Sequence, residues 1–95
     1  MKVSVKQAEK LAKHFHINLD AVDFDQWHLG LNVELEHGKR FGSTTNVTHD
    51  SLLLTAKITI AHLLEYPDYY RRLQKMEEAA DKFWSTKKKP NIFLE

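Results

Sequence analysis

Cysteine is absent from this sequence of 95 residues, and glycine and proline are scarce, with three and two residues. Without cysteine the chain cannot contain a disulfide framework, a thiolate zinc site or a cysteine nucleophile. The usual sign of a small secreted scaffold is also missing, so we expect an intracellular protein. The low glycine and proline content and the 42% of hydrophobic residues exclude a collagen-like repeat or a disordered linker and indicate one globular domain.

A long hydrophobic run and a large net charge are missing as well. No stretch approaches the roughly 18 apolar residues of a membrane span, and the opening residues, MKVSVKQAEK, lack the apolar run of a signal peptide. The 14 Lys and Arg residues nearly balance the 13 Asp and Glu residues, and the net charge of +1 provides no strong field for nucleic acid or an acidic membrane. We therefore expect a cytoplasmic chain without a membrane partner, and nucleic acid is not a favoured partner either.

Apolar residues recur at helical spacing in four segments of the chain. This pattern predicts an all-α fold, a compact single domain built as a bundle of about four helices. The helical domain is expected to span residues 1–86 and to be followed by a tail over residues 87–95. The four helices are predicted over residues 5–16, 24–37, 49–65 and 67–84.

Residue types at the ends of these segments predict how the helices begin and stop. Ser4 and Gln7 have the spacing of a capping box before the first helix. Gly38 is expected to end the second helix as a left-handed C-cap, and Thr48 to cap the third. Pro67 suits the first turn of the fourth helix, where its missing N–H group costs nothing.

The segment 41–48 is rich in Gly, Ser, Thr and Asn and has no helical period, so it is predicted to be a long loop. We expect it to be ordered, because Asn46 and Thr48 can bond to the local backbone.

The third predicted helix has nine apolar residues among the thirteen from Leu52 to Leu64, so it is expected to be the central and most buried helix. Its polar residues are informative, because at 100° per residue they share one narrow face where a solvated surface would hold Lys and Glu. They are Ser51, Thr55, Thr59, His62 and Tyr66.

Six histidines are the compositional oddity, and several lie near carboxylates at the ends of the second and third predicted helices. Without thiolates, a metal site here must use imidazole and carboxylate donors, which suit Zn, Fe, Mn or Ni. We predict one divalent ion held by His37 and His62 with one of Glu34 and Glu36, and we expect the two histidines to lie within reach of each other or of a shared ion. The residues expected around this site are Asn46, Thr48, His49, Glu65, Asp68, Tyr69 and Tyr70.

The motif that would make this site diagnostic is not found. There is no H-E-x-x-H sequence, and His62 and Glu65 show the Glu-x-x-His order of di-iron bundles only in reverse. No catalytic residue is predicted. Each polar residue also has a structural interpretation, as an ion pair with Lys57, Arg71 or Arg72 or as a hydrogen-bonded core group.

Glu34 follows the apolar stripe of the second helix, beside Leu31 and Leu35, so we expect it to be buried and paired. The run STKKKP after Trp84 is predicted to end the last helix, and its lysines are typical of a solvated linker. The apolar residues of NIFLE, at positions 91–95, either dock back onto the bundle or contact a partner.

Two stretches, GLNVELEHG at residues 30–38 and TNVTHDSLLLTAKITIAHLLEYPDYYRRLQKME at residues 45–77, resemble a small all-helical domain family of unknown function. The family occurs in bacteria, bacteriophages and large DNA viruses. The resemblance is carried by V-E-L-E-H-G, T-N-V-T with an acidic residue, A-H-L-x-E and P-D-Y-Y-x-R-L. It implies a shared polar set without an activity: Glu34, Glu36, His37, Asn46, Thr48, His62, Glu65, Asp68, Tyr69 and Tyr70.

Two functions remain open. The chain is either a metal-binding or small hydrolytic-type domain, or a non-enzymatic viral accessory, virion or protein-interaction component whose polar residues are structural. If the chain is viral, its location is the host cytoplasm or the virion.

Overall fold

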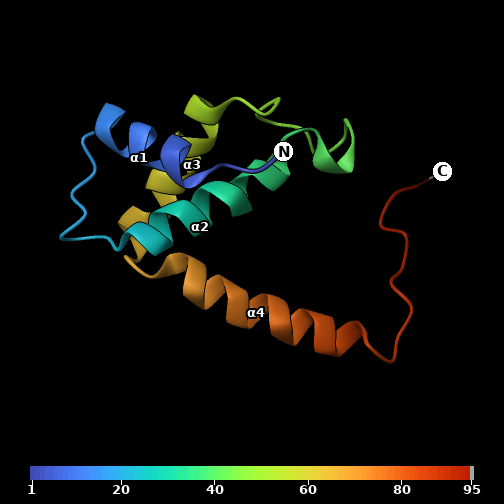
Figure 1. Cartoon of the computed structure of the whole chain (residues 1–95). Helices are drawn as coiled ribbons and strands as arrows, with labels where there is room; N and C mark the ends of the chain where they lie inside the picture. The colour runs from blue at the N-terminus through green and yellow to red at the C-terminus, as the bar shows by residue number, and fades with distance from the viewer. Residues whose placement is uncertain (95) are drawn as a thin grey trace.

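The computed structural model describes residues 1–94, and within them the chain forms helices and connecting loops without a strand (Figure 1). The all-α prediction is confirmed. Two short 3-10 turns, η1 at Leu35–His37 and η2 at Lys39–Phe41, lie between the second and third α-helices. The α-helices are α1 (Val5–His14), α2 (Phe24–Glu34), α3 (Leu52–Glu65) and α4 (Tyr69–Trp84). None of these helices combines the length and the apolar character needed to cross a membrane.

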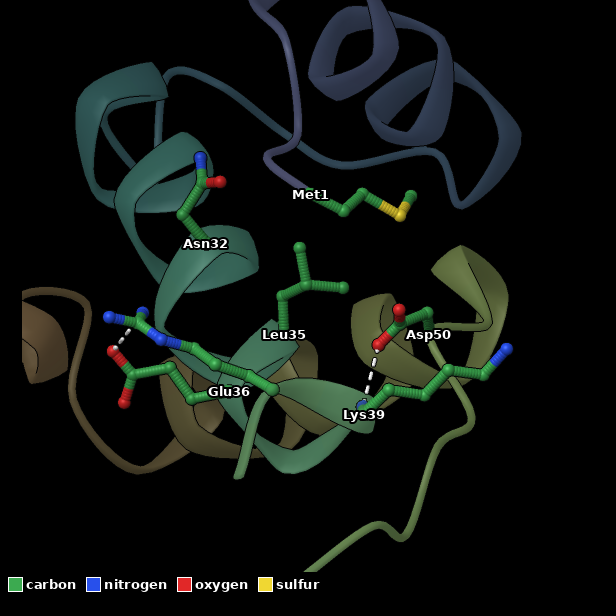
Figure 2. Close-up of a pocket in the computed structure, with 7 residues that line it drawn as sticks. Met1, Asn32, Leu35, Glu36, Lys39 and Asp50 are labelled. Carbon is green, nitrogen blue, oxygen red and sulfur yellow. Dashed lines mark hydrogen bonds and ion pairs between the residues drawn. The ribbon is translucent and has the colours of Figure 1, made fainter. Parts of the chain in front are cut away.

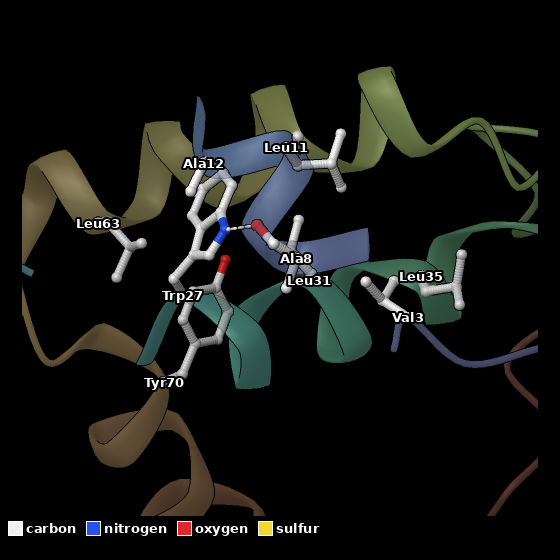
Figure 3. Packing of buried hydrophobic residues seen from close by; sticks show 10 residues of the cluster. Val3, Ala8, Leu11, Ala12, Trp27, Leu31, Leu35, Leu63 and Tyr70 are labelled. Atoms are coloured by element: carbon white, nitrogen blue, oxygen red, sulfur yellow. Dashed lines mark hydrogen bonds between the residues drawn. The ribbon is translucent and has the colours of Figure 1, made fainter. Parts of the chain in front are cut away.

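Helix α2 is the centre of the fold, because it contacts α1, α3 and α4. Its Trp27 and Leu31 are fully buried, and the Trp27 indole N–H donates a hydrogen bond of 2.9 Å to the Ala8 carbonyl oxygen of α1 (Figure 3). The prediction that α3 is the most buried helix is therefore wrong. Helix α3 covers only one side of α2 and leaves large apolar residues such as Leu53 and Leu64 exposed.

The polar face of α3 packs inward. Thr55 and Thr59 are fully buried, and their hydroxyls donate to the Ser51 and Thr55 carbonyl oxygens at 2.7 and 3.0 Å. Because the Thr59 hydroxyl is satisfied within α3, its methyl carbon can face Gly30 of α2. At Gly30 both neighbours approach α2 closely: an added Cβ would overlap the Tyr70 ring and lie 2.8 Å from the Thr59 methyl carbon. The small polar residues of α3 thus serve close helix packing.

The capping box before α1 is confirmed. The Gln7 N–H donates to Ser4 Oγ at 3.1 Å, and the Ser4 N–H donates to Gln7 Oε1 at 2.9 Å. The last turn after His14 is irregular, so α1 is shorter than the predicted 5–16.

The predicted cap of α3 is wrong by three residues. Ser51 is the N-cap, and its hydroxyl oxygen accepts the Leu54 N–H at 3.3 Å. Between Thr48 and the helix the chain reverses at His49 and Asp50, which have positive φ angles of 52° and 62°. This reversal prevents the helix from starting at residue 49, and Thr48 is buried instead.

The other two predicted helix ends also differ from the structure. Gly38 has a φ of −92°, so it is not a left-handed cap, and the regular part of α2 ends at Glu34 before the η1 turn. A side chain at Gly38 would collide with the Asp50 carboxylate, which explains glycine there without positive φ. Pro67 lies before α4, which begins at Tyr69.

Helix α4 joins the rest of the fold only through its beginning (Figure 1). Tyr70 is fully buried, but among the later side chains of α4 only Leu73 and Trp84 are even half-buried. The projection makes the molecule extended, with a radius of gyration of 15.0 Å against about 12 Å for a compact domain of this length.

We predict that Gly30→Ala destabilises the protein. Overpacking a closed contact costs about 1–3 kcal/mol, which exceeds the roughly 1 kcal/mol by which alanine favours a helix over glycine. Urea unfolding should give a lower midpoint for Gly30→Ala, whereas Gln74→Ala on exposed α4 should stay within about 0.5 kcal/mol of the original protein. A Gly30→Ala midpoint at or above that of the original protein would contradict the close packing of Tyr70 and Thr59 on α2.

Candidate functional site

The carboxylate of Glu34, at the end of α2, lies at the junction of three helices. Its residue is only 4% exposed, and the Tyr70 hydroxyl from α4 donates a hydrogen bond of 2.7 Å to Oε2. The prediction that Glu34 is buried and paired is confirmed. A buried carboxylate requires such partners, because removing an ionised group from water is costly unless it is hydrogen-bonded or paired.

Two histidines flank this carboxylate. His37 Nε2 lies 3.6 Å from Glu34 Oε1, and His62 Nε2 lies 3.6 Å from Glu34 Oε2. His37 comes one turn after Glu34, through η1, and His62 comes from α3. The expected proximity of His37 and His62 is thus confirmed, with one carboxylate between them.

The His62 ring is fixed between neighbours. Its Nδ1 lies 3.4 Å from Glu65 Oε1, but this contact does not have hydrogen-bond geometry, and Nδ1 is buried without a hydrogen-bond partner among the described residues. The ring stacks on Tyr69, with centroids 4.3 Å apart and planes 14° apart. His62 therefore presents one nitrogen to each of two carboxylates.

Two tyrosines lie beside the cluster: Tyr70 donates a hydrogen bond to Glu34, and Tyr69 packs on the His62 ring. Burial, followed by the hydrogen bond to Glu34, raises the pKa of Tyr70 far above its ordinary value. Burial, followed by the charges of Glu65 and Glu34, raises the pKa of Tyr69 as well. Neither phenol ionises near neutral pH, so Tyr70 holds Glu34 as a donor.

A Glu-x-x-His motif is present at Glu34–His37, although we expected none. Its signal in the sequence is the three-residue spacing of Glu34 and His37, in the order that His62 and Glu65 reverse. With both pairs included, a carboxylate and an imidazole three residues apart occur on each of two neighbouring helical segments. Four residues of ligand type thus form one chain of contacts: His37, Glu34, His62 and Glu65.

Glu36, predicted as an alternative ligand, lies outside this cluster. Being two residues from Glu34, it points elsewhere on the helix and contacts Arg40, with 3.4 Å between Oε1 and Nη1 (Figure 2). Asp68 also lies apart, because it pairs with Arg71 at 2.6 Å and with Arg72 at 2.8 Å.

The TNVT segment supports the site through the backbone rather than through its side chains. The His37 carbonyl oxygen accepts the N–H groups of Val47 and Thr48 at 2.7 and 3.2 Å. Asn46 Oδ1 accepts the His49 N–H at 2.8 Å. The structure therefore places Asn46, Thr48 and His49 beside the backbone of His37, with none of their side chains bonded to Glu34.

A second hydrogen bond joins the two ends of the loop between η1 and α3. Asp50 Oδ1 accepts the Lys39 N–H at 2.9 Å (Figure 2). The adjoining cavity of about 240 Å³ does not include Glu34, His37 or His62. It is lined by Met1, Asn32, Leu35, Glu36, Lys39, Arg40 and Asp50.

The four ligand-type side chains are arranged as a chain and not as a closed cage. Within residues 1–94, no three His, Asp or Glu side chains already surround one point where an ion would be held. Of the two histidines His37 is the more exposed, since 57% of its side chain is accessible, compared with 31% for His62.

Comparison with known proteins identifies a family that is described only as of unknown function. The model of a family described as "Protein of unknown function (DUF5661)" matches residues 8–79, which include every residue of the cluster. No curated protein matches the chain. No solved structure matches it either.

We predict that Glu34→Ala destabilises the protein by about 1–3 kcal/mol, because it leaves the buried Tyr70 hydroxyl without its acceptor. Glu78→Ala removes the same group from the exposed face of α4 and should change stability by no more than about 0.5 kcal/mol. Chemical denaturation of the two variants under identical conditions measures the difference. Equal unfolding midpoints would show that the Tyr70–Glu34 bond does not stabilise the fold.

The ion pairs between Asp68 and two arginines at the start of α4 predict that the stability of the fold depends on pH. Hydrogen bonds from Arg72 and then Arg71 lower the pKa of Asp68 from 3.8 to about 2. Since the folded-state pKa is lowered, the stabilisation is complete above pH 3.8 and is lost as pH falls through about 2.

Side-chain carboxyl NMR titration checks this prediction. In Arg72→Gln the Asp68 pKa should rise toward its ordinary value, whereas Lys75→Gln, which removes a charge without an Asp68 contact, should leave it low. The same Asp68 pKa in all three proteins would argue against the arginine pairing.

Proposed function

The chain belongs to the DUF5661 family, described only as of unknown function, and we propose from the geometry that it binds one divalent transition-metal ion through Glu34, His37 and His62. The observation that carries this proposal is a buried carboxylate with an imidazole nitrogen beside each of its oxygens. Zn, Fe, Mn and Ni all accept this combination of nitrogen and oxygen donors.

The distances support an ion between these groups. Each Nε2 atom lies 3.6 Å from the nearest Glu34 oxygen. This separation is shorter than two metal–ligand bonds laid end to end, at about 2 Å each, so an ion can reach both atoms of a pair. Because the His37 side chain is mostly exposed, its ring has room to turn and close the chain of contacts around the ion.

Glu65 fits the role of an orienting carboxylate. Metal-binding histidines commonly direct their second ring nitrogen to a carboxylate, which fixes the tautomer and the ring orientation. His62 Nδ1 lies beside Glu65 and has no hydrogen bond of its own among the described residues. A small turn of the exposed Glu65 side chain would satisfy that nitrogen while Nε2 faces the ion.

Three protein ligands leave a fourth position for water, which is the arrangement of hydrolytic metal sites. The fourth position would lie on the exposed side of the cluster, where the His37 side chain reaches solvent.

Titration of metal-free protein without a histidine tag tests the proposal. We expect one Zn²⁺ or Co²⁺ per chain by calorimetry, and a metal concentration of about 100 times Kd should raise the free energy of unfolding by about 2.7 kcal/mol. His37→Ala and His62→Ala should lose binding. His14→Ala, at the exposed end of α1, is the matched control and should retain it.

His37→Ala is the decisive variant, because its exposed side chain can be removed without opening the core. Equal metal binding by His37→Ala and His14→Ala would contradict the site. Absence of binding by the original protein would also contradict it, and the cluster would then be a structural connection between α2, α3 and α4.

A second candidate function is a protein-interaction component, such as a viral accessory or virion protein. The observation that favours it is the α4 helix, whose apolar Met76 and Phe83 are exposed along the projecting part. The occurrence that the sequence resemblance implies, in bacteriophages and large DNA viruses, agrees with this alternative.

A further inference from the structure

The structure argues against one of the two possibilities that the sequence left open for the end of the chain, namely docking onto the bundle. Ile92, Phe93 and Leu94 are exposed and do not dock onto the helical body. Phe83, at the end of α4, is exposed as well, and Trp84 is half-buried. Glu95 lies outside the described residues. Five apolar or aromatic side chains are thus gathered in the segment 82–94, which extends beyond the body (Figure 1).

The same segment is basic. Residues 82–94 contain four lysines and no acidic residue, whereas residues 1–81 contain ten basic and twelve acidic side chains. The net charge of +1 therefore conceals a negative body and a positive arm. One lysine already lies on an aromatic ring, because Lys87 Nζ is 3.9 Å from the centroid of Phe83.

We propose that residues 82–94, the basic arm, bind the surface of a lipid bilayer that contains anionic lipids. Lysines near such a surface are attracted by the negative headgroups. Trp and Phe side chains prefer the boundary between headgroups and acyl chains, where an apolar ring can enter while the chain stays hydrated. The arm combines both features, and no acidic residue interrupts it between Asp81 and Glu95, which border it in the sequence.

The position of the arm at the far end of α4 leaves it accessible to a bilayer surface. Because α4 is attached to the body only near Tyr70, it carries the basic arm away from residues 1–68, which contain seven basic and nine acidic side chains (Figure 1). We expected no membrane partner from the charge of the whole chain, but attraction is local, since charges are screened within about 10 Å at 0.1 M salt. The separation of charge along the molecule is what favours a lipid surface.

Co-sedimentation with vesicles tests this proposal. The full chain should bind phosphatidylcholine vesicles that contain phosphatidylserine, should not bind vesicles of phosphatidylcholine alone, and should dissociate as salt is raised from about 0.1 to 1 M. Replacing Lys87, Lys88 and Lys89 with glutamine should weaken binding by about 100-fold, given roughly tenfold for each 1.4 kcal/mol and about 1 kcal/mol for each lysine.

The control variant removes three lysines from an exposed face of α1. Lys6, Lys10 and Lys13 changed to glutamine give the same net charge as the first variant but leave the arm intact, so vesicle binding should be unchanged. Phe83→Ala combined with Phe93→Ala should weaken binding without altering charge.

Three results would overturn the proposal. They are equal loss of binding in the two triple-lysine variants, no binding of the original protein to phosphatidylserine vesicles, and unchanged binding when both phenylalanines are replaced. If the chain ignores vesicles but binds a DNA duplex through Lys87–Lys89, the basic arm recognises nucleic acid instead. All of the substituted residues are exposed, and circular dichroism should confirm that each variant keeps its helices.

Discussion

The buried hydrogen bond between Tyr70 and Glu34 is the constraint on which the arrangement of helices depends. A carboxyl group buried within a helical core needs hydrogen-bond partners close by, and Glu34 receives its hydrogen bond from outside the central helix. The donor comes from the first turn of α4, and the histidines on either side come from η1 and α3. Satisfying one carboxylate therefore fixes the relative positions of three helices.

The Tyr70 ring also determines the packing at Gly30, one helical turn before Glu34 on α2. It lies so close to Gly30 that no side chain fits there, and Thr59 closes the same space from α3. The threonines of α3 tolerate this burial because their hydroxyls bond to carbonyl oxygens of their own helix. Polar residues on an apolar helix thus mark close helix packing rather than a solvated face.

The same attachment leaves most of α4 uncovered. Only its beginning is held, by buried Tyr70 and by the Arg71 N–H that donates to Gln26 Oε1 of α2, so the apolar and basic residues beyond have no place in the core. The cluster around Glu34 and the arm at residues 82–94 are therefore distinct surfaces of one small chain. One is a polar junction suited to an ion, and the other is a cationic, aromatic extension suited to a charged surface.

Sequence patterns alone determined the helical class, the α1 capping box and the burial of Glu34, because each depends on periodicity or on residues a few positions apart. They also predicted that His37 and His62 approach each other. Two features depended on contacts between distant segments: the central place of α2 and the reversal at His49 and Asp50. A helical pattern reports which face is apolar but not how many neighbours cover it. For that reason only the tertiary structure could show that α3 is half exposed, that its threonines face inward, and that the chain after Trp84 stays away from the core.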